Sequence, residues 1–346
     1  HKAFVQIPQF SHKAIFSPDG QWLVVNSDDQ SIWAIPADKA GEKEDGRKKI
    51  ASVNGLTYDM VISSDSKWVA AVEYDSNIAE HNRVVLVSID GQQKHSLSHG
   101  GQTIETVAFT PDNKKIITSD QNGLINIWDV NTRGLLSSFN VDGIALSLTI
   151  SPDGKYLVAG IEEGNRSIVW SLSTLNQVAV LSQVGREGAA QFSTDGKFIA
   201  TGSSEGTIYL WNAEDGSFDL IENKLLTSGA VLSMDFSPNN RYLSVGDATG
   251  YVYLFDLELK QEVARLAHVD KVSGVSFSPD GQQLAAVSRK TVSIWDVPSI
   301  PLLTRDTLVE TACSHLIRNF DEVRWNTLFF EEEYRLICPN LPAGEN

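Results

Sequence analysis

The sequence predicts an all-β fold, a β-propeller of seven blades followed by a short α-helical C-terminal tail. The first observation behind this prediction is a five-residue motif of Phe or Ile, then Ser or Thr, then turn-forming residues. The fourth residue of its seven copies stands at positions 19, 65, 112, 153, 195, 239 and 280 of the 346-residue chain, so the copies recur every 41 to 47 residues. Turn residues between two apolar runs encode a strand–turn–strand unit. A period in the low forties is typical of four-stranded propeller blades.

The second observation is an aromatic position that follows the turn by about 15 residues and often precedes Asp or Asn. The segments are Ile32-Trp33, Ile127-Trp128-Asp129, Val169-Trp170, Leu210-Trp211-Asn212, Leu254-Phe255-Asp256 and Ile294-Trp295-Asp296. In the second copy the run at 84–89 takes this place without a Trp, after a longer insertion. Over residues 1 to about 297, the coupled copies resemble the WD-repeat family. The resemblance implies a closed propeller that acts as a recognition module.

Residues 1–297 are therefore predicted to form the propeller, and residues 298–346 a helical extension packed on it. The seventh copy supplies three strands but no convincing fourth. In WD-repeat propellers the N-terminal strand usually completes the last blade and so removes an exposed edge. We expect residues 2–6 to be this outer strand. The chain begins at His1 without an initiator Met or a leader, which suggests excision from a longer polypeptide.

The last 40 residues change from strand-like to helical spacing. Thr307 and Glu310 form a capping box, and an apolar stripe follows at helical spacing. Such a stripe is expected to pack on the propeller, together with a second short helix and Tyr334. The apolar residues concerned are Leu308, Val309, Ala312, Cys313, Leu316, Ile317, Trp325, Leu328, Phe329 and Tyr334. The segment 312–342 resembles a C-terminal signature of bacterial multidomain WD-repeat proteins. That resemblance implies an upstream effector, a STAND NTPase or a caspase-like domain, in the same polypeptide.

Composition excludes several classes of function. The formal net charge is −16, which disfavours nucleic-acid binding because phosphate recognition needs concentrated cationic side chains. No apolar run approaches the roughly 20 residues that span a bilayer, so no membrane partner is expected. Two cysteines in this length do not make a disulfide framework, and a reducing, cytoplasmic location is expected. No cofactor is predicted.

The predicted partner site is the upper face, at which the first strand of each blade begins. Four residues before the Phe or Ile of each motif lies a position that in WD-repeat proteins lines the upper mouth of the central channel. Its occupants are His12, Tyr58, Glu105, Leu146, Gly188, Leu232 and Ser273. The first three make a polar sector on consecutive blades, and the two leucines make an apolar one.

Two further segments are expected at this face. The insertion of the second copy carries Tyr74, His81 and Arg83, and Arg186 lies in a loop between copies. Together with the polar and apolar sectors, these residues form the predicted binding site for a protein or peptide ligand. Ordinary channel-lining residues without a ligand remain the competing interpretation.

Two alternatives to a recognition module stay open, a pure assembly scaffold and a propeller enzyme with a His and carboxylate site on the upper face. His12, His81, His99 and His268 are expected in loops of one face. However, no metal-binding or nucleophile motif accompanies them, so no catalytic and no metal residue is predicted.

Many WD repeats link a loop His, a Ser or Thr, a turn Asp and the strand Trp by hydrogen bonds. Counting six residues back from Trp128, Trp211 and Trp295 gives Asn122, Glu205 and Arg289 instead of Asp. We therefore expect no blade to contain the complete network, and blade cohesion to rest on apolar packing.

Overall fold

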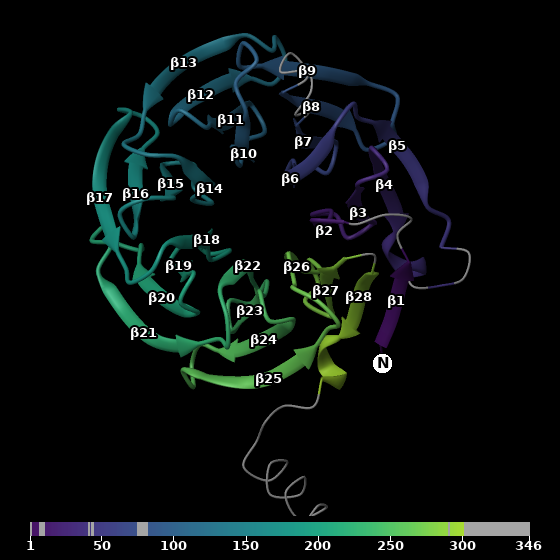
Figure 1. Ribbon diagram of the computed structural model, residues 1–346, viewed down its shortest axis with the longest axis vertical. Helices are drawn as coiled ribbons and strands as arrows, with labels where there is room; N and C mark the ends of the chain where they lie inside the picture. The colour runs from purple at the N-terminus through teal and green to yellow at the C-terminus, as the bar shows by residue number, and fades with distance from the viewer. Residues whose placement is uncertain are drawn as a thin grey trace, which may run out of the picture. The chain divides into compact units, whose positions relative to one another are not determined.

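A computed structural model describes residues 2–6, 11–40, 42, 45–74, 82–289 and 291–300. The chain divides into two compact units, His1–Ser299 and Ile300–Asn346. The first unit is a ring of seven four-stranded antiparallel sheets (Figure 1). This confirms the predicted seven-bladed propeller. The predicted helical tail and its buried side chains lie outside the described residues.

Each blade runs from an inner strand at the central channel to an outer strand at the rim. Blades 1 to 3 consist of β2 (Ala14–Phe16), β3 (Trp22–Ser27), β4 (Ser31–Pro36) and β5 (Lys48–Ser52); β6 (Leu56–Ile62), β7 (Trp68–Tyr74), β8 (Arg83–Ser88) and β9 (Lys94–Ser98); β10 (Ile104–Phe109), β11 (Lys115–Asp120), β12 (Leu124–Asp129) and β13 (Leu135–Asn140). Blades 4 and 5 consist of β14 (Ala145–Ile150), β15 (Tyr156–Ile161), β16 (Arg166–Ser171) and β17 (Asn176–Ser182); β18 (Glu187–Phe192), β19 (Phe198–Ser203), β20 (Thr207–Asn212) and β21 (Leu220–Leu226). Blades 6 and 7 consist of β22 (Val231–Phe236), β23 (Tyr242–Asp247), β24 (Tyr251–Asp256) and β25 (Gln261–Ala267); β26 (Gly274–Phe277), β27 (Gln283–Ser288), β28 (Thr291–Asp296) and β1 (Lys2–Gln6). Two short 3₁₀ turns are η1 (Ala37–Lys39) and η3 (Val297–Ser299).

The repeated motif encodes the hairpin between the first two strands of each blade. In blade 1 the Ser17 hydroxyl donates to Asp19 Oδ1 at 2.6 Å and accepts the Trp22 N–H at 2.9 Å. Asp19 Oδ1 also accepts the Gln21 N–H at 3.0 Å. The fifth motif residue has a positive φ in all seven copies, which explains why Gly, Asn or Ser occupies it. Side-chain acceptors and the left-handed position together fix the turn.

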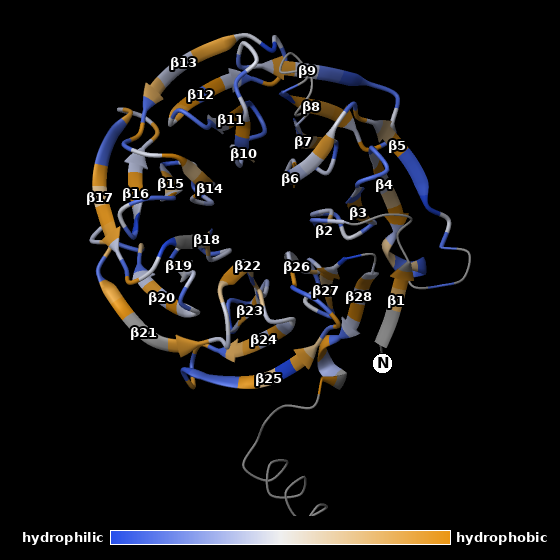
Figure 2. Cartoon of the chain, in the orientation of Figure 1, coloured by the Kyte–Doolittle hydropathy of each residue, from blue (hydrophilic) through white to orange (hydrophobic). Residues whose placement is uncertain are grey.

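The hydrophobic core lies between the blades. Each buried cluster combines residues of two neighbouring sheets: Val24 of blade 1 packs with Val85 of blade 2, for example, and Val158 of blade 4 with Ile199 of blade 5. Figure 2 shows hydrophobic colour on strands such as β8 and β12 and hydrophilic colour on the connecting turns. Burial of the facing sheets therefore stabilises the ring, because no single blade can bury both of its faces alone.

Side-chain oxygens also join consecutive blades along the channel wall. The inner strand is the edge of its sheet, so its outward N–H groups lack a ladder partner. Side chains of the preceding blade accept several of them: Asp59 from Val107 at 3.0 Å, Thr149 from Phe192 at 3.3 Å, Ser233 from Val275 at 3.1 Å, Asp235 from Phe277 at 2.7 Å and Ser276 from Phe16 at 3.3 Å. Polar residues on the inner strands therefore satisfy edge groups that would otherwise be unpaired.

The N-terminal strand closes the ring. β1 pairs antiparallel with β28, from Lys2 opposite Trp295 to Gln6 opposite Thr291. Val5 is 1% exposed and belongs to the cluster shared by blades 7 and 1. The pairing covers the edge of β28 and joins the start of the propeller to its end.

Deleting residues 1–6 should lower the free energy of unfolding by at least about 2 kcal/mol, because burying one Val side chain alone contributes about 1.5–3 kcal/mol. The exposed β28 edge should also promote self-association. Urea unfolding and size-exclusion chromatography of the truncated chain test both effects. An unchanged denaturation midpoint together with an unchanged elution profile would contradict the closing role of β1.

None of the helices formed by the described residues has the length and apolar character that a membrane-spanning segment requires.

Candidate functional site

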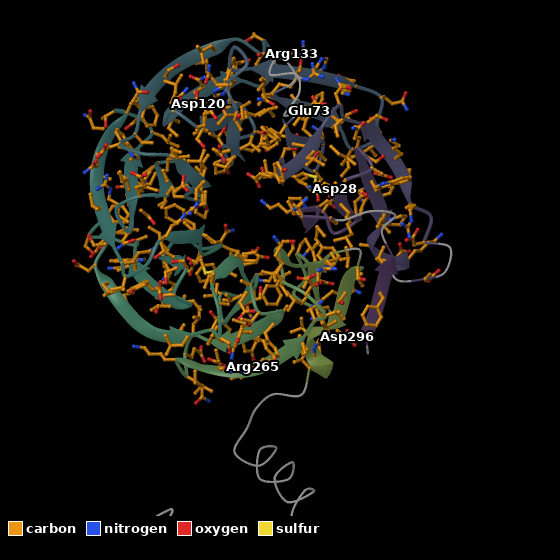
Figure 3. All side chains as sticks on the ribbon, viewed as in Figure 1. Asp28, Glu73, Asp120, Arg133, Arg265 and Asp296 are labelled. Atoms are coloured by element: carbon orange, nitrogen blue, oxygen red, sulfur yellow. The ribbon has the colours of Figure 1, made fainter. Side chains whose placement is uncertain are left out.

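A cavity of about 470 Å³ occupies the axis of the propeller. All seven residues that the sequence places at the channel mouth line it: His12, Tyr58, Glu105, Leu146, Gly188, Leu232 and Ser273. Figure 3 shows side chains reaching toward the central opening, with Asp28 close to it and Arg265 at the outer rim. Register counted from the turn motif therefore identifies the residues that surround the channel.

A row of three aromatic rings begins at the mouth, where His12 and Tyr58 line the cavity, and continues to Tyr74. The ring centroids of His12 and Tyr58 are 5.2 Å apart with an interplanar angle of 64°, and those of Tyr58 and Tyr74 are 5.9 Å apart. Edge-to-face and tilted arrangements at these distances are favourable for aromatic pairs. The Tyr58 side chain is nevertheless 47% exposed. His12, Tyr58 and Tyr74, called the aromatic wall below, thus present a preassembled surface.

Asp28, in the turn between β3 and β4, supports this wall. Its Oδ1 atom lies 3.1 Å from His12 Nε2. The backbone N–H of His12 donates to Asn26 Oδ1 at 3.1 Å, so the loop that carries the imidazole is fixed as well. Burial, and then the charges of Asp28 and Tyr74, raise the pKa of the Tyr58 hydroxyl. Tyr58 therefore stays a neutral hydrogen-bonding phenol.

Glu105, on β10, carries a half-buried negative charge at the mouth. Burial raises the pKa of its carboxyl, and the carboxylates of Glu162 and Asp120 raise it further. No described residue forms an ion pair or a hydrogen bond with its side chain. The charge of Glu105 is therefore uncompensated within the described part of the chain.

Two cationic residues near the mouth, in contrast, are each paired with a carboxylate. Lys13 Nζ lies 2.5 Å from Asp59 Oδ1, and Arg186 pairs with Glu162. Burial would raise the pKa of Asp59, but the Lys13 charge and hydrogen bonds from Lys13, Thr106 and Val107 lower it overall.

Arg83, predicted from the sequence to contact a partner, also has an internal role. Its Nε atom donates to Glu73 Oε2 at 2.6 Å, and the Glu73 side chain is fully buried. Glu73 also accepts the Asn54 N–H from the loop before β6. Arg83 thus neutralises a buried carboxylate. His81, its companion in the insertion, lies outside the described residues.

In blade 3 the four residues of the hydrogen-bond network found in many WD repeats lie together, but the contact between His99 and Asp120 is longer than a hydrogen bond. Trp128 Nε1 donates to Thr118 Oγ1 at 2.9 Å, and Thr118 Oγ1 lies 2.6 Å from His99 Nε2. His99 Nδ1 lies 3.6 Å from Asp120 Oδ2. Burial lowers the pKa of His99, although Asp120 opposes this shift. Counting six residues back from Trp128 did not find Asp120. This aspartate is the last residue of β11 and lies eight residues before Trp128.

Other blades keep only part of this network. In blade 5 Trp211 Nε1 donates to Thr201 Oγ1 at 3.0 Å, and Gln183 takes the place of the His, with 2.6 Å between Gln183 Oε1 and Thr201 Oγ1. In blade 7 Ala286 stands at the register of Thr118 and offers no hydroxyl. Since the His99 side chain is 0% exposed, it serves stability and not an upper-face reaction.

Sequence reasoning missed Asp28 and Asp235. Asp28 belongs to a two-aspartate turn between the second and third strands of blade 1, a connection that lies on the same face as His12. The position of this connection in the predicted blade could therefore have indicated Asp28 as a residue of the site. Asp235, on the inner strand β22, lines the cavity, and no pattern in the sequence distinguishes it from other alternating polar positions.

Within the described ranges, no group of three or more His, Cys, Asp or Glu side chains is arranged to hold a metal ion.

Comparison with known proteins agrees with the repeat pattern. The family model described as WD domain, G-beta repeat matches residues 91–129, 186–212, 223–256 and 260–296. These four segments carry WD40 repeats. Each match runs from the outer strand of one blade, or the loop after it, into the next blade. The matched aromatic positions are those of Trp128, Trp211, Phe255 and Trp295.

Blade 1 of the propeller lies outside those matches, and its tryptophan stands in a different register. Trp128 stands opposite Ile116, whereas Trp33 stands opposite Val25, two residues nearer the upper face. Ile35 occupies the position that the tryptophan holds in blade 3.

The chain is similar to several known proteins. It is 26% identical over 227 residues to the mouse U3 small nucleolar RNA-associated protein 18 homolog, covering 60% of this chain and 40% of that protein. It is 27% identical over 218 residues to a rice guanine nucleotide-binding protein subunit beta, covering 56% of each. Protein groucho of Drosophila melanogaster is 24% identical over 240 residues, covering 66% of this chain and 30% of groucho. The chain thus spans about half or less of these relatives.

Proposed function

We propose that this chain is a non-catalytic recognition module that binds a protein or peptide at the upper mouth of its channel. The observation that carries the proposal is the aromatic wall beside an open cavity, with Tyr58 47% exposed although it contacts His12 and Tyr74. Aromatic side chains at a concave centre are where interface energy concentrates. Two of the relatives are named as a subunit beta and as an RNA-associated protein, which supports a role for this chain as part of a larger assembly.

The competing function is an enzyme that uses His12 and Asp28. The 3.1 Å contact between His12 Nε2 and Asp28 Oδ1 would orient a general base. The His12 ring also contacts Tyr58 in an edge-to-face arrangement, however, so it is part of a packed wall. We favour recognition, and a purely scaffolding role at the upper face is a variant of it.

The larger setting proposed is the C-terminal part of a bacterial signalling or defence protein with an upstream effector or NTPase domain. The support is the resemblance of residues 312–342 to a bacterial C-terminal signature. The relatives named above, in contrast, come from mouse, rice and Drosophila. The sequence preceding His1 in the full-length gene tests this setting. A reading frame without such a domain would exclude it.

Tyr58→Ala should weaken binding of a selected ligand by at least about 1–2 kcal/mol, because a central aromatic anchor is lost. The ligands are obtained by selecting displayed peptides of random sequence on the immobilised chain, and affinities are measured by titration. Phe4→Ala is the matched control, since Phe4 is also 47% exposed but lies on the outer strand β1. Peptides that bind equally well to the double variant His12→Ala/Tyr58→Ala would refute the upper-face site.

A further inference from the structure

We propose that the cavity at the channel mouth receives a cationic side chain, an arginine or a lysine, of the bound polypeptide. Glu105 provides the counter-charge, and Tyr58 provides the aromatic face against which the cation lies. This inference rests on the proposed function and deepens it, since it names the chemistry of the ligand group that enters the channel.

The charged side chains that line the cavity favour a cationic ligand group. Of the residues described, six titratable side chains line it: Asp59, Glu105, Asp235, Lys13, His12 and Tyr58. Lys13 is paired with Asp59, and His12 with Asp28, which leaves the carboxyls of Glu105 and Asp235 without an ion-pair partner. A ligand that covered this cavity with neutral or anionic groups would strip water from Glu105 without compensation, which is costly. A cation removes that cost.

Asp235 supports the same conclusion from deeper in the channel. Its Oδ2 atom accepts the Phe277 N–H at 2.7 Å. Burial nevertheless raises the pKa of its carboxyl to about 7, although the N–H groups of Phe277 and Phe236 and the charge of Lys13 act in the opposite direction. Lys13 is already held by Asp59, so the wall contains no further cation for Asp235 among the described residues. A second carboxyl along the cavity thus favours an entering positive charge.

The remaining lining fits the rest of such a side chain. Tyr58 on β6 lies in the blade between those of His12 and Glu105, and its exposed ring offers a face for a cation–π contact. Leu146 on β14 and Leu232 on β22 line the same cavity with apolar groups. The aliphatic stem of Arg or Lys buries readily against apolar surface while its charged head stays at a polar site. Aromatic, acidic and apolar sectors therefore match the three parts of a long cationic residue.

The test is a double-variant cycle on peptides selected from the random displayed library. Each selected peptide is synthesised with its Arg and with citrulline, the neutral isostere, and is titrated against the wild-type chain and Glu105→Gln. Binding to the wild type should fall about tenfold or more with citrulline, since charge-assisted hydrogen bonds are the stronger ones. On Glu105→Gln the same replacement should change binding much less.

Glu258→Gln is the control variant, because it removes one carboxylate from an exposed turn between β24 and β25. It should leave the citrulline effect unchanged. Glu105→Gln is isosteric and removes an unpaired charge, so it should fold; thermal unfolding verifies this. As a measurement that needs no variant, the citrulline effect on the wild type should shrink when salt is raised.

The outcomes separate two kinds of failure. Selected peptides that depend on Tyr58 but carry no Arg or Lys would overturn this inference and leave the proposed function standing. An equal loss of binding with citrulline on Glu105→Gln and on the wild type would overturn it in the same way. If selected peptides ignore both His12 and Tyr58, or if selection yields none, the proposed function fails and this inference fails with it.

Discussion

Arg83→Met is expected to lower the free energy of unfolding by about 3–5 kcal/mol, although Arg83 lies at the surface insertion of blade 2. The reason is Glu73, whose side chain is 0% exposed and whose Oε2 atom accepts from Arg83 Nε at 2.6 Å. Removing the guanidinium leaves a buried carboxylate without its counter-ion, and breaking one partner of a buried pair has costs of this size. Urea unfolding at neutral pH measures the change.

Two further variants isolate the cause. The double variant Glu73→Gln/Arg83→Met should recover most of the lost stability, because a neutral Gln can still accept the Asn54 N–H without a buried charge. Arg166→Met is the surface control, since the side chain of its partner Asp142 is 94% exposed, and it should cost at most about 1 kcal/mol. Equal losses for Arg83→Met and Arg166→Met would show that Glu73 does not depend on Arg83.

The strands could be predicted because their signals are local. The sequence predicts the strands of blade 1 near 13–17, 22–26, 31–35 and 48–53, and β2 to β5 agree within one residue at every end. Alternating apolar residues and the turn motif determine both the sheet face and the register, and neither depends on distant contacts. The same register places His12, Tyr58 and Glu105 at the channel mouth.

Pairwise contacts between side chains could not be predicted in the same way. Asp120 reaches His99 from the end of β11, and its distance in sequence from Trp128 depends on the length of the β11–β12 hairpin. Glu73 and Arg83 meet across an insertion, so no fixed spacing reveals their pairing. The repeats share the backbone geometry of a blade, whereas the polar partners differ from blade to blade.

Asp235 makes a further property of the propeller testable, the dependence of its stability on pH. The carboxyl ionises near pH 3.8 in the unfolded chain and near 7 in the folded one. Between these values the folded state binds more protons than the unfolded state, so the free energy of unfolding falls as pH rises. Well below pH 3.8 both states are protonated and the effect vanishes; well above pH 7 it is constant.

Asp235→Asn removes this titration. The stability of the variant relative to the wild type should therefore rise by about 2–4 kcal/mol from pH 4 to pH 8. The upper figure corresponds to about three pKa units at 1.36 kcal/mol each, and water in the channel reduces it. Taking the difference at each pH cancels the titration of the other carboxylates that both proteins share. Glu258→Gln, an exposed carboxylate remote from the channel, should show a flat difference curve. A flat curve for Asp235→Asn would mean that Asp235 ionises as freely in the folded chain as in the unfolded one, and the channel wall would then lack the buried acid that favours an entering cation.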